Sequence, residues 1–314
     1  MSFDGTDERI EGNAEERFDQ AGPEDVDAPA ADDLPEIEEG RYLYCIVAVG
    51  EYADGESDTA LETTGVDDEP VSVIVADGVG AVVHACDGLY DSADLAQVRR
   101  WLVRHQTVVD EAGQAFGTPI PFQFDTILRG DDDGVREWLR AEHDTLSHAL
   151  EALADHWEYR VEVVEIDPPD DETLIEHHDA LGDLATRIDE ADEGTGHLLE
   201  KRLDQQLTDL RAARRESVAA DLEARLADVT REVHALERSP TASLSDAVDE
   251  GDEAGETICR FTLLAHEDDE ATVGSILDDV ASTDGLEVRF TGPWPPYTVA
   301  PELGGEDAPS TEEP

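Results

Sequence analysis

The amino-acid sequence predicts an α+β protein of two domains. Short apolar runs rich in β-branched and aromatic residues, which favour strands, alternate with segments whose apolar residues recur every three or four positions, which favour helices. Both kinds of segment occur before and after residue 130, and a chain of 314 residues is long enough for two hydrophobic cores. We therefore expect an N-terminal domain over residues 40–130 and a C-terminal domain over residues 131–300.

The first domain is expected to begin with a strand and a hairpin. The run RYLYCIVAVG is apolar and β-rich and ends at Gly50. The run VSVIVADGVGAVVHAC contains two strand-like halves, and Gly78 and Gly80 supply the turn between them. A dinucleotide-binding fingerprint would need a helix after these glycines and a third glycine, and the run continues as a strand instead.

A helix and an extended segment complete the first domain. In DSADLAQVRRWLVRHQTVVDEAG, Ser92 or Asp94 is the expected N-cap, and apolar residues at helical spacing predict a buried face of Leu95, Val98, Leu102 and Val109. The segment TPIPFQFDTIL follows and is expected to be extended. Strand, hairpin, helix and strand are the elements of a ferredoxin-like α/β sandwich that lacks one helix.

The C-terminal domain is predicted to be α+β with a long helical segment. GVREWLRAEHDTLSHALEALAD and DETLIEHHDALGDLATRIDEAD have helical patterns, and the strand YRVEVVEID lies between them. Residues 197–238 carry a Leu/Val stripe with one gap at Arg214, which predicts either one long helix that packs along both domains or two helices that meet near Arg214. A strand (TICRFTLLAHE), a helix (ATVGSILDDVAST) and a last strand (GLEVRFTGPWPPYTVA) follow.

The charge of the chain is far from zero. Eighty Asp and Glu face 21 Lys and Arg, which gives a formal net charge of -59. An acidic chain that still carries periodic apolar runs is typical of a folded protein adapted to molar salt, where the electrostatic screening length falls to about 3 Å. Residues 1–39 and 301–314 are acidic and lack periodicity, so we expect them to be disordered tails.

The same composition argues against several classes of partner. Nucleic acids and anionic membrane surfaces are bound by patches of Lys and Arg. The densest basic run, RAARR at residues 211–215, is flanked by acids and is expected to be a solvated helix face with i,i+4 ion pairs. No apolar run reaches the roughly 18 residues of a membrane span, and the N-terminus lacks the pattern of a signal peptide. We expect no membrane insertion and a cytoplasmic protein, with Cys45, Cys86 and Cys259 as buried reduced thiols.

Catalytic, cofactor and metal sites are not predicted. His143 and His148 do not share a helix face, His177 and His178 are adjacent and point apart, and the sequence has no HExxH or CxxC motif. Asp and Glu are so numerous that a pair of them carries no information about acid–base catalysis. Nucleophile-elbow, Walker and kinase motifs do not occur either. The sequence therefore predicts a protein that is not an enzyme and binds no cofactor or metal.

Several short motifs occur in an order that is similar to a known family. They are RYLYCIV, AVVH, WLVRH, PIPFQFDTIL, YRVEVVEI, GTGHLLEKRL and, near the C-terminus, TGPWPPY. Together they resemble the GvpL/GvpF family of gas vesicle proteins over residues 41–299, and the acidic composition and long tails favour a haloarchaeal protein of the L type. The chain departs from the family in PFQFDT, where PxRFGT is usual, and in YRVEV, where a strand of the WGVKV type is usual.

The resemblance implies a two-domain accessory protein of gas vesicle assembly, located in the gas vesicle and the cytoplasm. Its implied partners are the small shell protein and other accessory gas vesicle proteins. The alternative is a soluble acidic adaptor, unrelated to vesicles, that binds a partner through the Leu/Val stripe of residues 197–238. Such stripes more often form part of a protein's own core than a partner site.

The candidate site is a motif at the end of the last predicted strand: Thr291, Gly292, Pro293, Trp294, Pro295, Pro296 and Tyr297. The alternation of GLEVRF breaks there, and prolines cannot donate a hydrogen bond to a sheet, so the motif must leave the sheet or run along its edge. We expect Trp294 and Tyr297 to pack either on this protein's own sheet or interdomain groove, where a Trp is more often found, or on a partner.

Overall fold

The computed structural model describes residues 37, 39–50, 61–236 and 255–299. They fall within one compact unit of the chain. The predicted tails, apart from Ile37 and Glu39, lie outside the described residues. Ile37 and Glu39 belong to the fold, because Ile37 is buried and Gly130 N donates a hydrogen bond to the Glu39 carbonyl at 2.9 Å.

The first sheet is antiparallel. Its strands are β1 (Gly40–Ala48), β2 (Ser72–Ala76), β3 (Val79–Cys86), β4 (Ile120–Pro121) and β5 (Ile127–Arg129). Their order is β2-β3-β1-β4, and β5 also pairs with β1. The predicted hairpin is confirmed, but its turn consists of Asp77 and Gly78, which have φ values of 49° and 85°, whereas Gly80, expected in the turn, lies in β3. Asp-Gly suits this turn because both positions need a positive φ.

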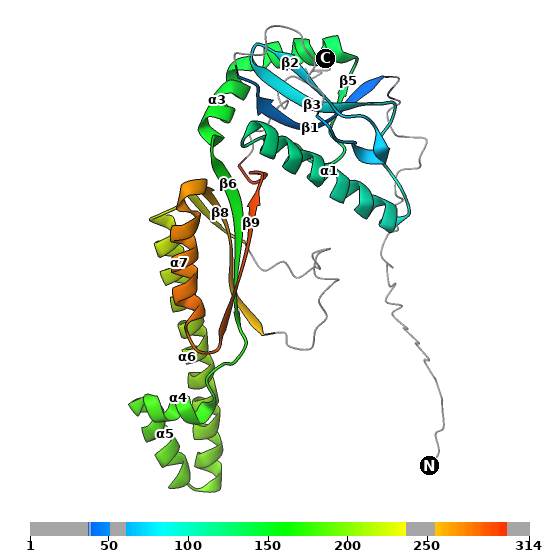
Figure 1. Cartoon of the computed structure of the whole chain (residues 1–314). Helices are drawn as coiled ribbons and strands as arrows, with labels where there is room; N and C mark the ends of the chain where they lie inside the picture. The colour runs from blue at the N-terminus through cyan, green and yellow to red at the C-terminus, as the bar shows by residue number, and fades with distance from the viewer. Residues whose placement is uncertain (1–36, 38, 51–60, 237–254, 300–314) are drawn as a thin grey trace, which may run out of the picture. The chain divides into compact units, whose positions relative to one another are not determined.

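Helices cover both faces of the first sheet. Helix α1 (Leu95–Phe116) shares one core with Tyr42 and Tyr44 of β1, and α2 (Asp132–Ala141) and α3 (His143–Leu153) share another with Leu43 and Ile46 (Figure 1). Because both faces of β1 are buried, its sequence is a continuous apolar run. Helices α2 and α3 thus pack with the first sheet, on the face opposite α1. The domain boundary that we predicted at residue 130 assigned α2 and α3 to the C-terminal domain, apart from the sheet that they cover.

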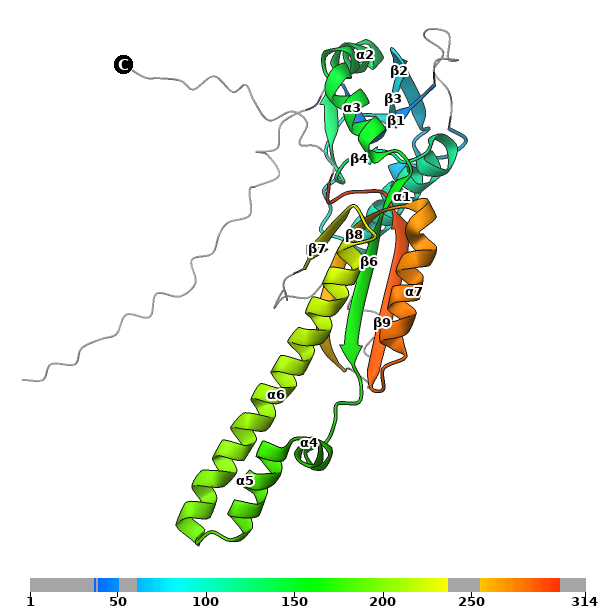
Figure 2. The same cartoon turned by 90° about the vertical axis from the view of Figure 1, so that its left-hand side faces the viewer.

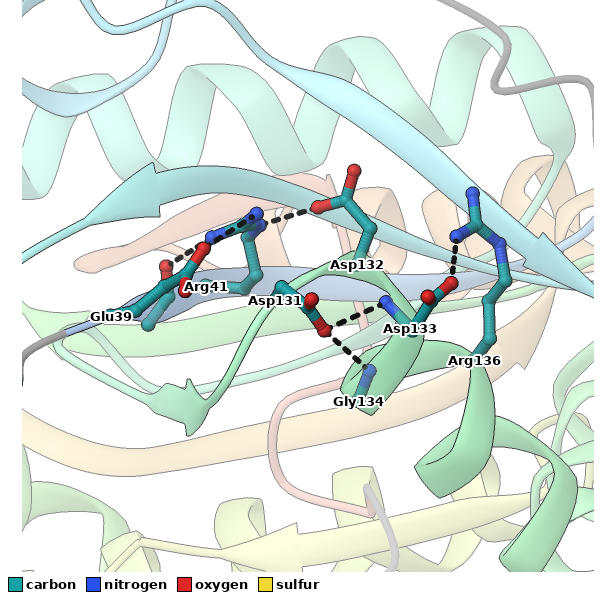
Figure 3. A network of polar contacts seen from close by, with 8 residues as sticks. Glu39, Arg41, Asp131, Asp132, Asp133, Gly134 and Arg136 are labelled. Carbon is teal, nitrogen blue, oxygen red and sulfur yellow. Dashed lines mark hydrogen bonds and ion pairs between the residues drawn. The ribbon is translucent and has the colours of Figure 1, made fainter.

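An ion-pair network joins the start of β1 to the start of α2 (Figure 3). Arg41 Nε donates a hydrogen bond to Asp132 Oδ1 at 2.6 Å, and its guanidinium lies 3.6 Å from Glu39. The Asp131 side chain caps α2 by accepting from the backbone N–H groups of Asp133 and Gly134. Cap and ion pair together fix the start of α2 beside the first strand.

The second sheet has the order β7-β8-β6-β9. Its strands are β6 (His156–Glu165), β7 (Glu232–Ala235), β8 (Glu256–His266) and β9 (Leu286–Trp294). One face packs on α6 (Glu193–Ala227) and α7 (Glu270–Ala281), through a core that includes Tyr159, Leu222, Phe261 and Leu277. Two sheets with their own helices confirm the α+β fold class.

Helix α6 is one uninterrupted helix of 35 residues, with α5 (Asp179–Asp189) alongside part of it (Figure 2). The apolar stripe of α6 packs on other elements of the same chain. Leu207 packs with Leu174 of α4 (Asp171–His177) and Leu181 of α5, whereas Leu222 and Leu226 belong to the core of the second sheet. The helix therefore packs within the C-terminal part of the chain.

Arginines of α6 are ion-paired to other elements, which corrects the expectation of a solvated face with pairs along the helix. Arg214 and Arg215 both bind Glu165, which is buried at the end of β6, and Arg215 also binds Glu256 at 2.6 Å. Arg211 binds Asp171 at 2.6 Å. We call Glu165, Arg214 and Arg215 the Glu165 clamp, because it fixes the middle of α6 to the second sheet.

Three predicted helical segments differ from expectation: one ends early and two are divided. The long segment 197–238 ends as a helix at Ala227, and residues 232–235 form β7, which pairs with β8. Apolar residues spaced by four suit a helix or a short strand, and the free edge of β8 decides in favour of the strand. The other two are each divided, at Glu142 between α2 and α3 and at His178 between α4 and α5.

Candidate interaction site at the end of the last strand

The candidate motif begins inside strand β9, which is an edge strand of the second sheet. Thr291 lies opposite Arg160 and Trp294 lies opposite Glu158, so two residues of β9 face a single residue of β6. This is a β-bulge, a feature that tolerates proline because the ladder is locally interrupted. Residues 291–294 of the motif thus run along the sheet edge, and residues 295–297 follow the end of the strand.

Gly292 is the residue that allows this bulge. Its φ is 134°, a backbone conformation that other residues rarely adopt. A Cβ atom at this position would lie 2.8 Å from Cδ1 of Tyr159 and 3.0 Å from the carbonyl oxygen of Glu158. Glycine is therefore required both by conformation and by space.

Trp294 is exposed, with 38% of its surface accessible. It pairs with Glu158, and neighbours along β6 alternate between faces, so it lies on the face opposite Tyr159 and the core beneath α6 and α7. Trp294 therefore lies outside the core beneath α6 and α7, and its packing on a partner stays a prediction. The bulge is the physical reason, because an extra residue in β9 changes which face the following side chain takes.

The second half of the motif packs against the protein. Pro295 and Pro296 are buried, and Tyr297 is half-buried. The Tyr297 hydroxyl donates a hydrogen bond to Gln106 Oε1 of α1 at 3.0 Å, and burial raises the Tyr297 pKa, so the hydroxyl stays protonated. Thr298 N donates to Glu158 Oε2 at 2.9 Å. The motif thus holds an exposed indole between an edge strand and an anchored proline segment.

These groups suit recognition and not bond chemistry. The site offers an aromatic ring, prolines and a protonated phenol, and none of them is poised as a nucleophile or base at neutral pH. Over the described ranges no group of three His, Cys, Asp or Glu side chains could hold a metal ion. No helix in this part of the chain is long and apolar enough to cross a membrane.

A pocket of about 620 Å³ lies where β8 extends past β7. Its walls come from α6, β7 and β8 and include Ala219, Leu236, Ile258 and Phe261. Cys259 also lines it, and burial raises the pKa of this thiol to about 11, so the thiolate nucleophile is scarce near pH 7. Cys45 is fully buried, whereas Cys86 and Cys259 are half-buried, and all three are free thiols.

The family model described as gas vesicle synthesis protein GvpL/GvpF matches residues 40–300. This chain belongs to the GvpL/GvpF family. The match spans both sheets and the whole candidate motif. The family that the order of motifs pointed to is therefore confirmed.

Similar proteins point to the L branch of the GvpL/GvpF family. Gas vesicle protein L1 of Halobacterium salinarum is 44% identical over 268 residues, which cover 85% of this chain and 92% of that protein. Gas vesicle protein L of Haloferax mediterranei is 37% identical over 85% of this chain and 89% of that protein. Both relatives are haloarchaeal, in keeping with the acidic composition.

Two crystal structures have the GvpL/GvpF fold in common with this chain. The gas vesicle protein GvpF from Anabaena sp. PCC7120 has a TM-score of 0.54 at 18% identity and covers 84% of this chain and 96% of its own. GvpF from Microcystis aeruginosa has a TM-score of 0.53, also at 18% identity. Membership of the GvpL/GvpF family supports an accessory role in gas vesicles.

Proposed function

We propose that this protein is an accessory assembly protein of gas vesicles that binds the small shell protein and other accessory gas vesicle proteins. We further propose that it acts in the cytoplasm and at the gas vesicle. The observation that carries the proposal is the exposed indole of Trp294 in the family motif, on an edge strand that has an open side within the described residues. Exposed Trp residues with rigid surroundings are favourable anchors in protein interfaces, because little entropy is lost when they are covered.

The physical demands of gas vesicle assembly agree with the rest of the chain. A wall that separates gas from water needs an apolar face, so its subunits tend to aggregate before assembly. A protein with a net charge of -59 stays soluble while it contacts such subunits. The proposal calls for no catalysis.

The alternative function, an adaptor that binds a partner through the Leu/Val stripe of residues 197–238, required this stripe to be accessible, and it is packed within the chain. Leu203, Leu207 and Leu210 pack on α4 and α5, and Leu222 and Leu226 are buried under the second sheet. A partner could reach these side chains only if α6 left the fold.

The proposal can be tested by replacing Trp294. A halophilic host that carries the vesicle genes but lacks this one is complemented with wild type, Trp294→Ala or the matched control Leu198→Ala, which removes another exposed apolar side chain (69% accessible) from α6. The tagged proteins are then used to capture the purified shell protein in molar KCl.

We expect Trp294→Ala to abolish vesicle formation and to reduce shell-protein capture, while Leu198→Ala leaves both unchanged. The melting temperature of Trp294→Ala should stay near that of wild type, because the indole is not in a core. Normal vesicles and normal capture with Trp294→Ala would contradict the proposed role of this residue. A wild-type protein that captures no gas vesicle protein in molar KCl would contradict the proposed function.

A further inference from the structure

Helix α1 exposes three large apolar side chains, and the sequence pattern predicts two of them, Leu95 and Leu102, to be buried. Leu95 is 70% accessible, Leu102 38% and Val103 67%. The face that packs on the first sheet consists instead of Trp101, His105, Val108, Val109 and Ala112. The expected stripe thus holds for Val109 and for the half-buried Val98, and it is wrong for Leu95 and Leu102. The core of this protein therefore does not account for these leucines or for Val103.

The same helix carries no acidic residue from Leu95 to Val109, although 80 of the 314 residues are Asp or Glu. Other acid-free runs in the chain, such as the strand β1 and the hairpin strand β3, are mostly buried. Along α6, in contrast, exposed positions are frequently acidic, as at Asp204, Asp209 and Glu216. Solvation at high salt therefore explains the surface of α6 but not that of α1.

Two exposed arginines lie among these apolar side chains. Arg99 and Arg100 are both on the solvent side of α1, and within the described residues neither forms an ion pair. Arg104, one turn further on, donates hydrogen bonds to Thr63 and Thr64, so its guanidinium is already bound within the protein. The exposed surface of Leu95, Arg99, Arg100, Leu102 and Val103, which we call the α1 face, is thus apolar and locally cationic.

The spacing of these residues matches helix packing. Leu95, Arg99 and Val103 follow one another at intervals of four, which forms a ridge on a helix surface, and Leu102 lies beside this ridge. The ridge spans about two turns, or roughly 12 Å of helix axis. A second helix can place its own apolar side chains along such a ridge and its charged side chains beside the two arginines.

We propose that the α1 face binds an acidic amphipathic helix of another protein. The apolar stripe of the partner helix covers Leu95, Leu102 and Val103, and carboxylates that flank the stripe pair with Arg99 and Arg100. Charge complementarity selects this partner, because the surface is cationic within a strongly anionic protein and so attracts carboxylates where the rest of the chain repels them. This surface is separate from Trp294 and does not depend on the proposed function.

The salt dependence of binding should distinguish the contribution of the arginines from that of the apolar contacts. Molar KCl screens the contribution of the arginines, because the screening length becomes comparable to an ion-pair distance. It does not weaken the apolar contacts, which depend on area removed from water. Replacement of an apolar residue should therefore matter at every salt concentration, whereas replacement of the arginines should matter more at the lower one.

The test uses the full-length protein and a labelled synthetic peptide of 18 residues (about 27 Å of helix), with Leu at positions i, i+3, i+4 and i+7 and Glu elsewhere. Binding is measured by fluorescence anisotropy in 1 M and 3 M KCl (roughly 3 Å screening or less). The variants are Val103→Ser and the pair Arg99→Gln/Arg100→Gln. Their matched controls on the exposed surface of α6 are Leu198→Ser and the pair Lys201→Gln/Arg202→Gln. A thermal unfolding curve for each variant confirms that it is folded.

We expect the peptide to bind wild type saturably and Val103→Ser to weaken binding about tenfold at both salt concentrations. The arginine pair should weaken binding more in 1 M than in 3 M KCl, and both controls should bind as wild type does. The proposal is overturned if the peptide does not bind, if a Leu/Lys peptide binds equally well, or if the controls lose as much affinity as the α1 variants. It is also overturned if sedimentation reveals a dimer that Val103→Ser dissociates, or if vesicles of anionic lipid bind the α1 face in place of the peptide.

Discussion

The hydroxyl of Tyr42 lies 2.9 Å from Nδ1 of His105, in the core between β1 and α1. Nε2 of His105 lies 3.0 Å from the carbonyl oxygen of Phe122, which can only accept a hydrogen bond, so Nε2 carries the proton and Nδ1 accepts from Tyr42. His84 has a similar position, with Nδ1 at 2.8 Å from the Tyr44 hydroxyl and Nε2 at 2.8 Å from that of Tyr90. Both histidines thus fit their surroundings in the neutral form.

This arrangement predicts a loss of stability in mild acid. Burial lowers the pKa of His84 and of His105 from 6.5 to about 4. Between pH 6.5 and about pH 4, these histidines bind protons in the unfolded chain but not in the folded one. The stability that comes from keeping them neutral is therefore present above pH 6.5 and is lost as the pH falls towards 4. Each histidine can contribute a slope of up to about 1.4 kcal/mol per pH unit in this window.

The measurement is denaturant unfolding of wild type, His84→Gln and His105→Gln between pH 7.5 and pH 4.5, in molar KCl. Protonation of the many carboxylates also changes stability with pH, so the difference between wild type and variant is the informative quantity. We expect the variants to be less stable at pH 7.5 and to lose less stability on acidification. Parallel curves for all three proteins would show that the histidines do not titrate as inferred.

Replacement of Gly292 by alanine should destabilise the protein. The substitution places a Cβ atom 2.8 Å from Tyr159 in a conformation with φ of 134°, and such strain costs about 1–3 kcal/mol. Gly274 in the middle of α7 is the matched control, because a Cβ there meets no atom within 4 Å. Gly274→Ala should stabilise the protein by about 0.5–1 kcal/mol. Equal effects of both substitutions on the free energy of unfolding would refute the steric account of the bulge.

Neutralisation of Glu165 should loosen the attachment of α6. Glu165 is 4% accessible, and Arg214 and Arg215 both bind its carboxylate. Loss of a partner from a buried ion pair costs about 3–5 kcal/mol, and we expect about 1–3 kcal/mol for Glu165→Gln because the two arginines remain partly solvated. Glu216→Gln, at an exposed position next to the clamp, should change stability by less than about 0.5 kcal/mol. Chemical denaturation of both variants in molar KCl compares the two values, and a Glu165→Gln protein as stable as wild type would contradict the clamp.

The net charge predicts that folding requires salt. At low ionic strength a charge of -59 opposes compaction, and molar KCl screens this repulsion. Circular dichroism should therefore report a folded α+β protein in 3 M KCl. In a dilute buffer of 0.01 M ionic strength the screening length is roughly 30 Å, so the carboxylates repel one another and the chain should be largely unfolded. A native spectrum in dilute buffer would contradict the adaptation to high salt.

Sequence patterns succeeded where one local signal dominates. Gly78 in the hairpin turn, the Asp94 cap of α1, whose side chain accepts from Ala96 N, and the prolines of an edge strand each follow from the chemistry of one or two residues. The family motif also follows from local sequence, since its residues are contiguous.

Patterns failed where distant contacts decide between two local possibilities. Val233 continues a helical spacing, yet it pairs with Leu263 in the sheet. Leu95 and Leu102 continue an apolar spacing, yet Trp101 and His105 take the buried side because they meet the hydroxyl and aromatic groups of the first sheet. Trp294 is exposed because of a bulge that depends on the register with β6, which sequence alone does not specify.

The uninterrupted course of α6 past the Glu165 clamp makes the α5–α6 pair a rigid spacer. Helix α6 begins at Glu193, 21 residues before Arg214, a length of about 31 Å at 1.5 Å per residue. Its contacts with α4 and α5 stiffen this length, whereas a single isolated helix would bend. Anything bound at the far end of the pair is consequently kept at a fixed distance from the second sheet, and an insertion of seven residues in both helices would lengthen that distance by about 10 Å.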